Sequence, residues 1–469
     1  MGKPDPNDSD WSDLDLLTVN EATERLDAEI AALTGQLGAL AGTERDAANR
    51  RLDLLVAARD RAAAGPKRPL YDAPPDRPAH VPAELVRDVD HVFGPDFLVD
   101  PFAAYRELRD RRVWWSPRHG GFWILTRAED IRGAYQQPDL FSSAATGIPA
   151  HVQRKEKLYP LELDPPAHTA YRRVIAPLFA PKAVTARTAA IDATCAALVD
   201  EIAPRGRAEF LADFAEPFPT RIFTNILGLP VAEAPKFVAW NNKLLHSQDQ
   251  PERRREAGLE INGYLRELIE ARRAEPRDDV VSALLASEVD GRPIENDEIQ
   301  NLCFLLFIAG LDTVTAALSW SFRFLALHPE HRRQIVDDPA LIPSAVEELL
   351  RVHSFVNPAR TVTRDAEFAG VQLREGDRVL LATALVAQDP EEFADEATVR
   401  FDRDANRHLA FGAGPHRCAG SHLARDELAT ALTLWHRQIP DYEIAPGETV
   451  TMHAGGVFGL DRLPLVWST

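Results

Sequence analysis

The run Phe411-Gly412-Ala413-Gly414-Pro415-His416-Arg417-Cys418-Ala419-Gly420 says most about how this chain folds. Its three glycines let the backbone pass very close to a flat partner. Apolar residues then recur at helical spacing, at Leu428, Leu432, Trp435 and Ile439. The pattern predicts a loop, a thiol and a helix. A thiol at a helix N-terminus beside a basic residue is biased toward thiolate, the reactive and metal-binding form of cysteine.

Three roles compete for Cys418. A zinc site would recruit His416 and His422, but a structural zinc site needs four well-spaced ligands. The only other cysteines, Cys195 and Cys303, lie far away in the chain. A buried structural cysteine does not explain the flanking glycines. The third role is an axial haem ligand, with the bare loop against the porphyrin and the thiolate favouring O–O cleavage.

Residues 411–427 resemble the haem-binding signature of the cytochrome P-450 superfamily in its bacterial form. The likeness covers about residues 80–469, and the segments 215–219 and 463–467 are similar to the bacterial camphor hydroxylase family in particular. The resemblance implies a mainly α fold with a small β region. It also implies haem b (iron protoporphyrin IX) as cofactor, Cys418 as the ligand to its iron, and monooxygenase activity.

Composition excludes several classes of function. With 469 residues, 45% of them hydrophobic, the chain can bury a large core. Asp and Glu outnumber Lys and Arg by 72 to 53, and the net charge of −19 argues against nucleic acid or an anionic membrane as main partner. Three scattered cysteines and a start without an apolar signal core indicate the cytoplasm. The most apolar run, 302–311, is too short to span a bilayer.

Residues 1–65 are predicted to form an N-terminal extension. Five apolar residues recur there at alternating four- and three-residue spacing, the pattern of a coiled-coil stripe: Leu26, Ile30, Leu33, Leu37 and Leu40. A second helical pattern follows Gly42, so we expect an antiparallel helical hairpin, and then a proline-rich arm that leads into the catalytic domain, residues 66–469. The stripe would either pack on the catalytic domain or serve self-association or docking of another protein.

A long helix is predicted to begin at a cap formed by Asn296 or Asp297 and to end before Pro329. At its centre an acid and an alcohol, Asp312 and Thr313, interrupt apolar residues. Such groups are costly in an apolar helix unless they bond something. A threonine that bonds back to a carbonyl of its own helix is the structural alternative.

This helix is similar to the oxygen-binding helix of the superfamily. The resemblance implies that Asp312 and Thr313 are catalytic and deliver protons during dioxygen activation. In the camphor hydroxylase family, basic residues on a preceding segment hold the acid, and Val238 and His246 stand at those places here. We therefore expect a different arrangement, with His246 as the partner of Asp312.

The resemblance also implies which residues bind the haem propionates. They are His168, Arg172, Arg360 and His416. His168 and Arg172 lie at helical spacing and face the same side. Glu348 and Arg351, which lie within one turn of a predicted helix, resemble the family's buried structural pair and receive no catalytic role.

The substrate pocket is predicted by the same comparison to be lined by five residues: Gly147, Leu305, Ala309, Val356 and Val457. Gly147 stands where the camphor hydroxylase family has a phenylalanine, and Glu156 stands where it has the substrate-bonding tyrosine. The remaining positions are apolar. We therefore expect a small hydrophobic substrate other than camphor, a terpenoid or an aromatic-aliphatic molecule.

Electrons must come from outside, because the chain has no flavin or iron–sulfur pattern. The resemblance implies a two-iron, two-sulfur ferredoxin and a ferredoxin reductase. A basic docking surface is expected on the cysteine side of the haem, at Arg172, Arg173, Lys182, Arg417 and Arg425. Two other functions stay open: a peroxide-driven peroxygenase of the same fold, and a non-catalytic haem sensor or scaffold that assembles through the N-terminal hairpin.

Overall fold

The computed structural model describes residues 77–148, 157–245, 250–404 and 406–469, and before them residue 27, residues 30–39 and scattered positions between 45 and 59. From residue 77 onward the α-helices are α3 (Pro95–Val99), α4 (Pro101–Arg106), α5 (Ala128–Gln136), α6 (Ala167–Ile175), α7 (Pro181–Thr185), α8 (Thr188–Ile202), α9 (Pro217–Ile226), α10 (Ala234–Leu245), α11 (Pro251–Ala274), α12 (Val280–Leu285), α13 (Asn296–Leu327), α14 (Pro329–Asp337), α15 (Ile342–Val352), α16 (Thr383–Ala387) and α17 (Ser421–Gln438).

The strands are short: β1 (Val113–Ser116), β2 (Phe122–Leu125), β3 (Phe141–Ser142), β4 (Arg207–Glu209), β5 (Glu288–Val289), β6 (Arg292–Pro293), β7 (Ala359–Val362), β8 (Ala366–Phe368), β9 (Val371–Leu373), β10 (Arg378–Leu380), β11 (Glu443–Ile444), β12 (Thr451–His453), β13 (Gly459–Arg462) and β14 (Pro464–Val466). The predicted mainly α fold with a small β region is confirmed.

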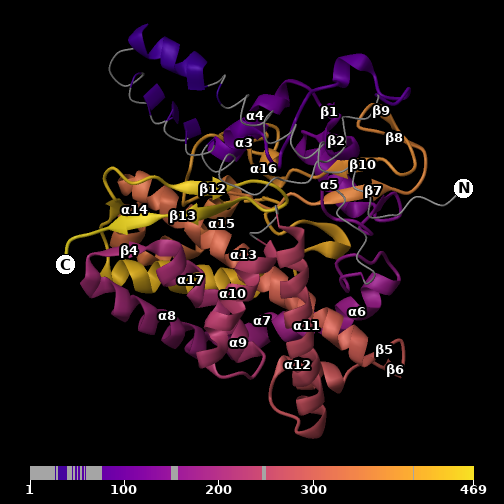
Figure 1. Cartoon of the computed structure of the whole chain (residues 1–469), viewed down its shortest axis with the longest axis vertical. Helices are drawn as coiled ribbons and strands as arrows, with labels where there is room; N and C mark the ends of the chain where they lie inside the picture. Colours follow the sequence, from indigo (N-terminus) through magenta and orange to yellow (C-terminus); the bar gives the residue numbers. More distant parts are fainter. Residues whose placement is uncertain are drawn as a thin grey trace, which may run out of the picture.

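The main sheet has five strands in the order β1-β2-β10-β7-β3. Strand β2 pairs antiparallel with β1 and parallel with β10, so segments far apart in the sequence lie side by side. All four side chains of β2 are buried, as is typical of a strand covered on both faces. The strand-like stretches 121–126 and 378–381 correspond to β2 and β10. Figure 1 shows these strands at the upper right, away from α8 and α9 at the lower left.

Helix α13 begins at Asn296, but its cap is Glu295 rather than the predicted Asn296 or Asp297. The Glu295 side chain accepts a hydrogen bond from the Glu298 backbone, and the Glu298 carboxylate accepts one from the Glu295 N–H at 2.8 Å. This capping box satisfies two backbone donors reciprocally, which a single short side chain does not. The helix start therefore lies where it was expected, with a different capping residue.

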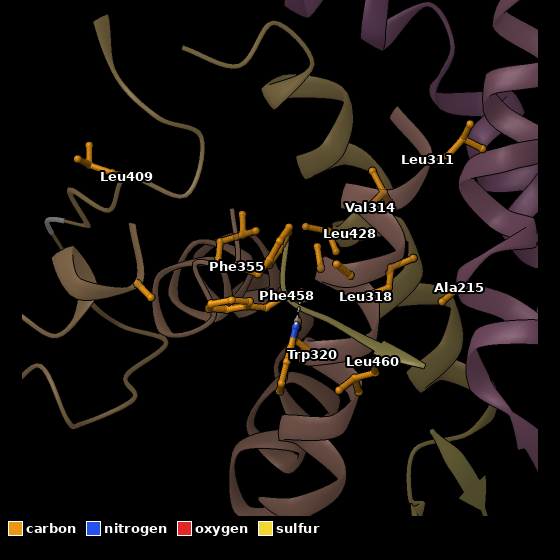
Figure 2. Packing of buried hydrophobic residues seen from close by; sticks show 14 of the residues in the cluster. Ala215, Leu311, Val314, Leu318, Trp320, Phe355, Leu409, Leu428, Phe458 and Leu460 are labelled. Carbon is orange, nitrogen blue, oxygen red and sulfur yellow. Dashed lines mark hydrogen bonds between the residues drawn. The ribbon is translucent and has the colours of Figure 1, made fainter. Parts of the chain in front are cut away.

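The packing of α17 on the centre of α13 fixes the middle of the core. Figure 2 shows Leu428 of α17 beside Val314 and Leu318 of α13, and all three are buried. The Trp320 indole N–H donates to the Phe458 carbonyl at 3.0 Å, so this buried donor is satisfied. By length and composition α13 could cross a membrane, but its most apolar window is 72% buried inside the molecule, which assigns it to the core.

Only part of the predicted N-terminal extension belongs to the described residues. Leu55 is fully buried and packs with Ile30, Leu33 and Val99, the last residue of α3. The described residues of the extension thus contact the catalytic part at α3. The hairpin as a whole, its boundary at residue 65 and most of the proline-rich arm lie outside the described residues and stay predictions.

A buried ion pair ties α15 to the segment that precedes the Cys418 loop. Glu348 and Arg351 are 0% and 1% exposed, and two Arg351 nitrogens lie 2.8 Å from the two carboxylate oxygens of Glu348. Arg403 Nε lies 3.0 Å from Oε2 of the same carboxylate. Burial raises the pKa of Glu348, but the hydrogen bonds from Arg351 and from the Arg400 N–H outweigh it and leave the pKa below its ordinary value. The carboxylate is therefore charged, enclosed and paired.

Replacing Glu348 with glutamine removes this charge and keeps the size of the side chain. Arg351 would then be a buried cation without a carboxylate, and we expect the free energy of unfolding to fall by about 3 kcal/mol. Urea unfolding of the haem-loaded protein, followed by circular dichroism, measures the loss. Glu367→Gln, at the exposed centre of β8, is the matched control and should change stability by less than about 0.5 kcal/mol. Equal stability of the two variants would contradict a stabilising role of the pair.

Candidate active site

The loop that carries Cys418 is shaped by two glycines and by α5. Gly412 and Gly414 have φ of 66° and 65°, the left-handed region that favours glycine. A Cβ at Gly414 would lie 2.2 Å from the Tyr135 carbonyl oxygen, so any side chain there would collide with α5. Gly420 has an ordinary φ of −82°, and its N–H bonds the Cys418 thiol. Two of the three glycines are thus required by the packing of the chain itself.

The Cys418 side chain has exposed surface although many protein atoms surround it, so the thiol is accessible to a bound group. Burial raises the pKa of the thiol. The Gly420 N–H and the cations Arg172, Arg417 and Arg425 lower it, but by less than burial raises it. The predicted bias toward thiolate is therefore wrong for the chain alone. A bound metal ion would supply the missing stabilisation, because coordination deprotonates a thiol.

A buried histidine, His168, and a half-buried one, His416, meet beside this loop. The His168 and His416 ring centroids are 4.1 Å apart. Both ring nitrogens of His168 and Nε2 of His416 are buried and have no hydrogen-bond partner among the described residues. Burial lowers the pKa of both, and His168, Arg360 and Arg172 help to bring that of His416 to about 3. Both rings are therefore neutral near pH 7, with N–H groups available to an outside acceptor.

Two arginines complete the surroundings of the loop. Arg360 is 4% exposed, lies 5.4 Å from the Tyr135 ring centroid and donates Nη1 to the Ala359 carbonyl at 2.8 Å. Arg172 donates Nη2 to the Arg417 carbonyl at 2.5 Å. Neither guanidinium forms an ion pair with any described residue. An unpaired guanidinium in a buried place is costly and calls for an anionic partner.

These groups fit haem, which carries two carboxylates beside its iron. The unpaired nitrogens of His168, His416 and Arg360 can donate charge-assisted hydrogen bonds to propionates, and the Cys418 thiol can coordinate the iron. Arg172 lies close enough to Cys418 for its charge to lower the thiol pKa. The structure thus brings together all five residues that were predicted to bind the cofactor.

Arg378 is a member of this site that the sequence did not reveal. Its Nη2 donates to the Ala145 and Gly147 carbonyls at 3.0 and 2.7 Å, and burial together with the nearby Arg360 lowers its pKa to about 10. It therefore positions the backbone at Gly147, a predicted pocket residue. A basic residue in the buried strand β10 was the available signal, but its target depends on a pairing with β7 that the sequence does not show.

The centre of α13 differs from the rest of the helix. Ala309 is exposed and Gly310 and Thr313 are half-buried, whereas the flanking turns are mostly buried. The Thr313 hydroxyl donates to the Ala309 carbonyl at 2.7 Å, which is the contact of the structural alternative. Asp312 is 7% exposed. Its predicted partner His246 lies outside the described residues.

Among the other predicted pocket residues, Val356 and Val457 form an isolated antiparallel bridge, which brings two loops together. Leu305 is 8% exposed and lies about one turn before Ala309 on α13. Glu156 lies outside the described residues. The apolar character of the described positions agrees with the expected hydrophobic pocket.

The zinc alternative receives no support. Among the described residues, the group of three side chains close enough to share a metal ion is His328, Glu330 and His331, at the junction of α13 and α14. It includes neither Cys418 nor His422. A closed four-ligand zinc site around the thiol is therefore not formed by these residues.

A mainly helical fold with one thiol on a glycine loop, surrounded by unpaired cations and imidazoles, defines a haem-thiolate enzyme. The family model described as Cytochrome P450 matches residues 233–437. The chain belongs to the cytochrome P450 family. It is accordingly a monooxygenase that uses haem b.

Relatives match over most of the chain. It is 36% identical to the probable cytochrome P450 127A1 of Sinorhizobium fredii (strain NBRC 101917 / NGR234), over 83% of this chain and 97% of that protein. It is 32% identical to the steroid C26-monooxygenase of Mycobacterium tuberculosis (strain ATCC 25618 / H37Rv), over 78% and 93%. The solved structure of CYP101C1 matches with a TM-score of 0.79 at 35% identity, over 84% of this chain and 100% of that one. The expected likeness to the bacterial camphor hydroxylases is confirmed.

Replacing Cys418 with serine tests the axial ligand directly. A serine hydroxyl does not supply a thiolate, so the reduced, carbon-monoxide-bound protein should lose the red-shifted Soret band of thiolate-ligated haem. Absorption spectroscopy of the purified variant measures this. Cys195→Ala, at a buried cysteine of α8, is the matched control and should keep the band. A red-shifted band in Cys418→Ser would exclude Cys418 as the ligand.

Proposed function

We propose that this cytochrome P450 hydroxylates a small hydrophobic molecule, a terpenoid or an aromatic-aliphatic compound, at an unactivated C–H bond. The exposed centre of α13 carries this proposal, because Ala309 and Gly310 have no polar side-chain group that could select a substrate. Shape and apolar contact are left as the means of recognition. The names of two relatives, a steroid C26-monooxygenase and a methyl-branched lipid omega-hydroxylase, support a hydrophobic substrate class.

In the proposed arrangement Cys418 is the chain's ligand to the haem iron, and His168, Arg172, Arg360 and His416 bind the propionates. When bound, haem supplies the iron at which dioxygen is activated and the substrate is hydroxylated. Each neutral imidazole offers one N–H donor and each guanidinium offers several, which suits the acceptor oxygens of two carboxylates. The same contacts hold the Cys418 loop, because Arg172 also binds the Arg417 carbonyl.

Asp312 and Thr313 are the proposed proton carriers. The Thr313 hydroxyl uses its only O–H in the hydrogen bond to the Ala309 carbonyl. The lone pairs of Oγ1 therefore stay free to accept a hydrogen bond from another donor. Asp312, the preceding residue, is nearly buried and would pass protons from solvent to Thr313 Oγ1. The hydrogen bond from Thr313 to the Ala309 carbonyl therefore fits both roles: it is the contact of a structural threonine, and it would orient the hydroxyl of a catalytic one.

The proposed electron donor is a two-iron, two-sulfur ferredoxin, reduced by a ferredoxin reductase. Arg173, Lys182 and Arg417 are exposed and form no ion pair with any described residue. Arg425 differs, because its Nε and Nη2 lie 2.5 and 2.8 Å from the Glu347 carboxylate. Its charge is compensated, so we assign the docking surface to the three exposed cations. A cytoplasmic location agrees with three free cysteines.

Charge reversal at this surface should weaken electron delivery without changing the haem. In Arg173→Glu we expect the KM for ferredoxin to rise roughly threefold to tenfold at low salt, because rim charges steer association. NADH-driven turnover against ferredoxin concentration measures it. Arg437→Glu, an exposed cation at the far end of α17, is the matched control and should be unchanged. Equal effects of both variants would place the docking surface elsewhere.

Thr313→Ala and deletion of residues 1–65 separate the proposed function from its rivals. We expect Thr313→Ala to bind substrate, seen as a low- to high-spin shift, but to form at least about tenfold less product per NADH consumed, because the hydroxyl oxygen that accepts and positions the incoming proton donor is lost. The deletion variant should keep product formation. Turnover with peroxide but not with ferredoxin and NADH would support the peroxygenase. Product formation that requires the extension would support the scaffold.

A further inference from the structure

A cavity of about 190 Å³ lies apart from the candidate active site, between α4, the last turns of α13, the end of α15 and α16. Apolar side chains form much of its wall, among them Val99, Phe102 and Trp320. Trp320 follows Thr313 by seven residues on α13, so the two sites are roughly 10 Å apart along that helix. None of the residues proposed above to bind haem, substrate or ferredoxin lines this cavity.

Arg323 of α13 points a cation at this cavity. Its Nε is buried without a hydrogen-bond partner, and its guanidinium carbon lies 5.5 Å from the Trp320 ring centroid. No described carboxylate forms an ion pair with it. Burial lowers its pKa, and Asp100 raises it only in part. A guanidinium stays protonated in proteins, so Arg323 is a half-buried cation without a contacting counter-charge among the described residues.

Two further polar groups in the wall lack partners. His353 is 8% exposed and stacks on Trp320 at 5.6 Å and 12°, and its Nδ1 has no hydrogen-bond partner among the described residues. Burial and the Arg323 charge lower its pKa to about 3, so the ring is neutral. Gln388 donates to the Phe102 carbonyl at 2.8 Å, and its Oε1 is buried and unpartnered. The apolar wall therefore carries one unpaired cation and two unsatisfied neutral groups.

The other charged residues at the cavity do not neutralise the Arg323 guanidinium. Arg351 is compensated by Glu348, as described above. Asp100 is exposed, and its Oδ1 caps α4 by accepting two backbone N–H bonds. Arg106 is exposed at the same rim, and the Glu396 side chain forms no ion pair with a described residue. Solvent screens the rim charges, whereas Arg323 lies deeper.

We propose that this cavity binds a small organic carboxylate with an apolar body, held by the guanidinium fork of Arg323 with its body against Trp320. A carboxylate matches the planar fork and supplies the missing charge. The apolar part of the wall, which includes Trp320, Phe102 and Val99, favours a ligand with an apolar body over an inorganic anion. A cavity of about 150 Å³ holds a benzene molecule, so this larger one admits a ligand of the size of benzoate.

Occupancy would stabilise the folded chain, because the cavity is built from four helices that separate on unfolding. Occupancy would also affect the packing of the N-terminal extension, because Val99 lines the cavity and packs against Leu55. A carboxylate ligand would therefore change the stability of the fold and the packing of the N-terminal extension at Val99. It would not change the chemistry at the haem.

Benzoate and benzyl alcohol, which differ mainly in charge, test the proposal on the haem-loaded full chain. Equilibrium dialysis should show one benzoate per chain, bound at least about tenfold more tightly than benzyl alcohol, because a charge-assisted pair is lost with the alcohol. The Soret band should not move, which separates this cavity from the substrate pocket. Benzoate should also raise the midpoint of thermal unfolding. This comparison needs no variant.

Arg323→Leu locates the site. It should weaken benzoate binding at least about tenfold and leave benzyl alcohol binding unchanged or stronger, because the cation is replaced by apolar surface. Arg333→Leu, an exposed arginine of α14, is the matched control and should bind benzoate as the wild type does. Absence of saturable benzoate binding, equal affinity for the two ligands, equal affinity of wild type and Arg323→Leu, or binding that appears only with a Soret shift would each overturn the proposal.

Discussion

The structure depends on one constraint: a loop almost without side-chain bulk must present the Cys418 thiol while the helix behind it stays fixed. Gly414 meets the Tyr135 carbonyl so closely that a Cβ would collide with it, which locks the loop on α5. Leu428 holds α17 on the middle of α13. The enclosed carboxylate of Glu348 ties the incoming segment to α15. Rigidity around the thiol therefore comes from three different kinds of contact, steric, apolar and ionic.

The chain alone leaves buried polar groups unsatisfied at the cofactor site. Among the described residues, ring nitrogens of His168 and His416 have no hydrogen-bond partner, and no carboxylate forms an ion pair with Arg360. Each such group costs free energy when it is enclosed without a hydrogen bond. The thiol likewise has a raised pKa. In the proposed arrangement haem would remove these costs together, since its propionates would accept hydrogen bonds and its iron would stabilise the thiolate. Cofactor binding and folding stability are thus linked through the same side chains.

The sequence revealed the groups that belong to one local pattern and missed those that need distant partners. Cys418 stands in a contiguous run, and Asp312 with Thr313 interrupts an apolar helix, so both were visible. The cap of α13 was misplaced by one position, because Glu295 acts only together with Glu298. Arg425 was assigned to the docking surface, but the structure pairs it with Glu347, far away in the sequence.

The same distinction explains the pKa of the thiol and the different roles of Arg351 and Arg323. Counting neighbouring cations predicts a lowered thiol pKa, but burial, which depends on the packing of the whole loop, decides the sign. Two arginines at the second cavity illustrate how distant partners decide the role of a cation. Arg351 donates to a carboxylate and to three backbone carbonyls, so it needs nothing further. Arg323, half-buried in the same region, has no such set among the described residues. The difference between a satisfied and an unsatisfied guanidinium separates a structural residue from one that faces a ligand.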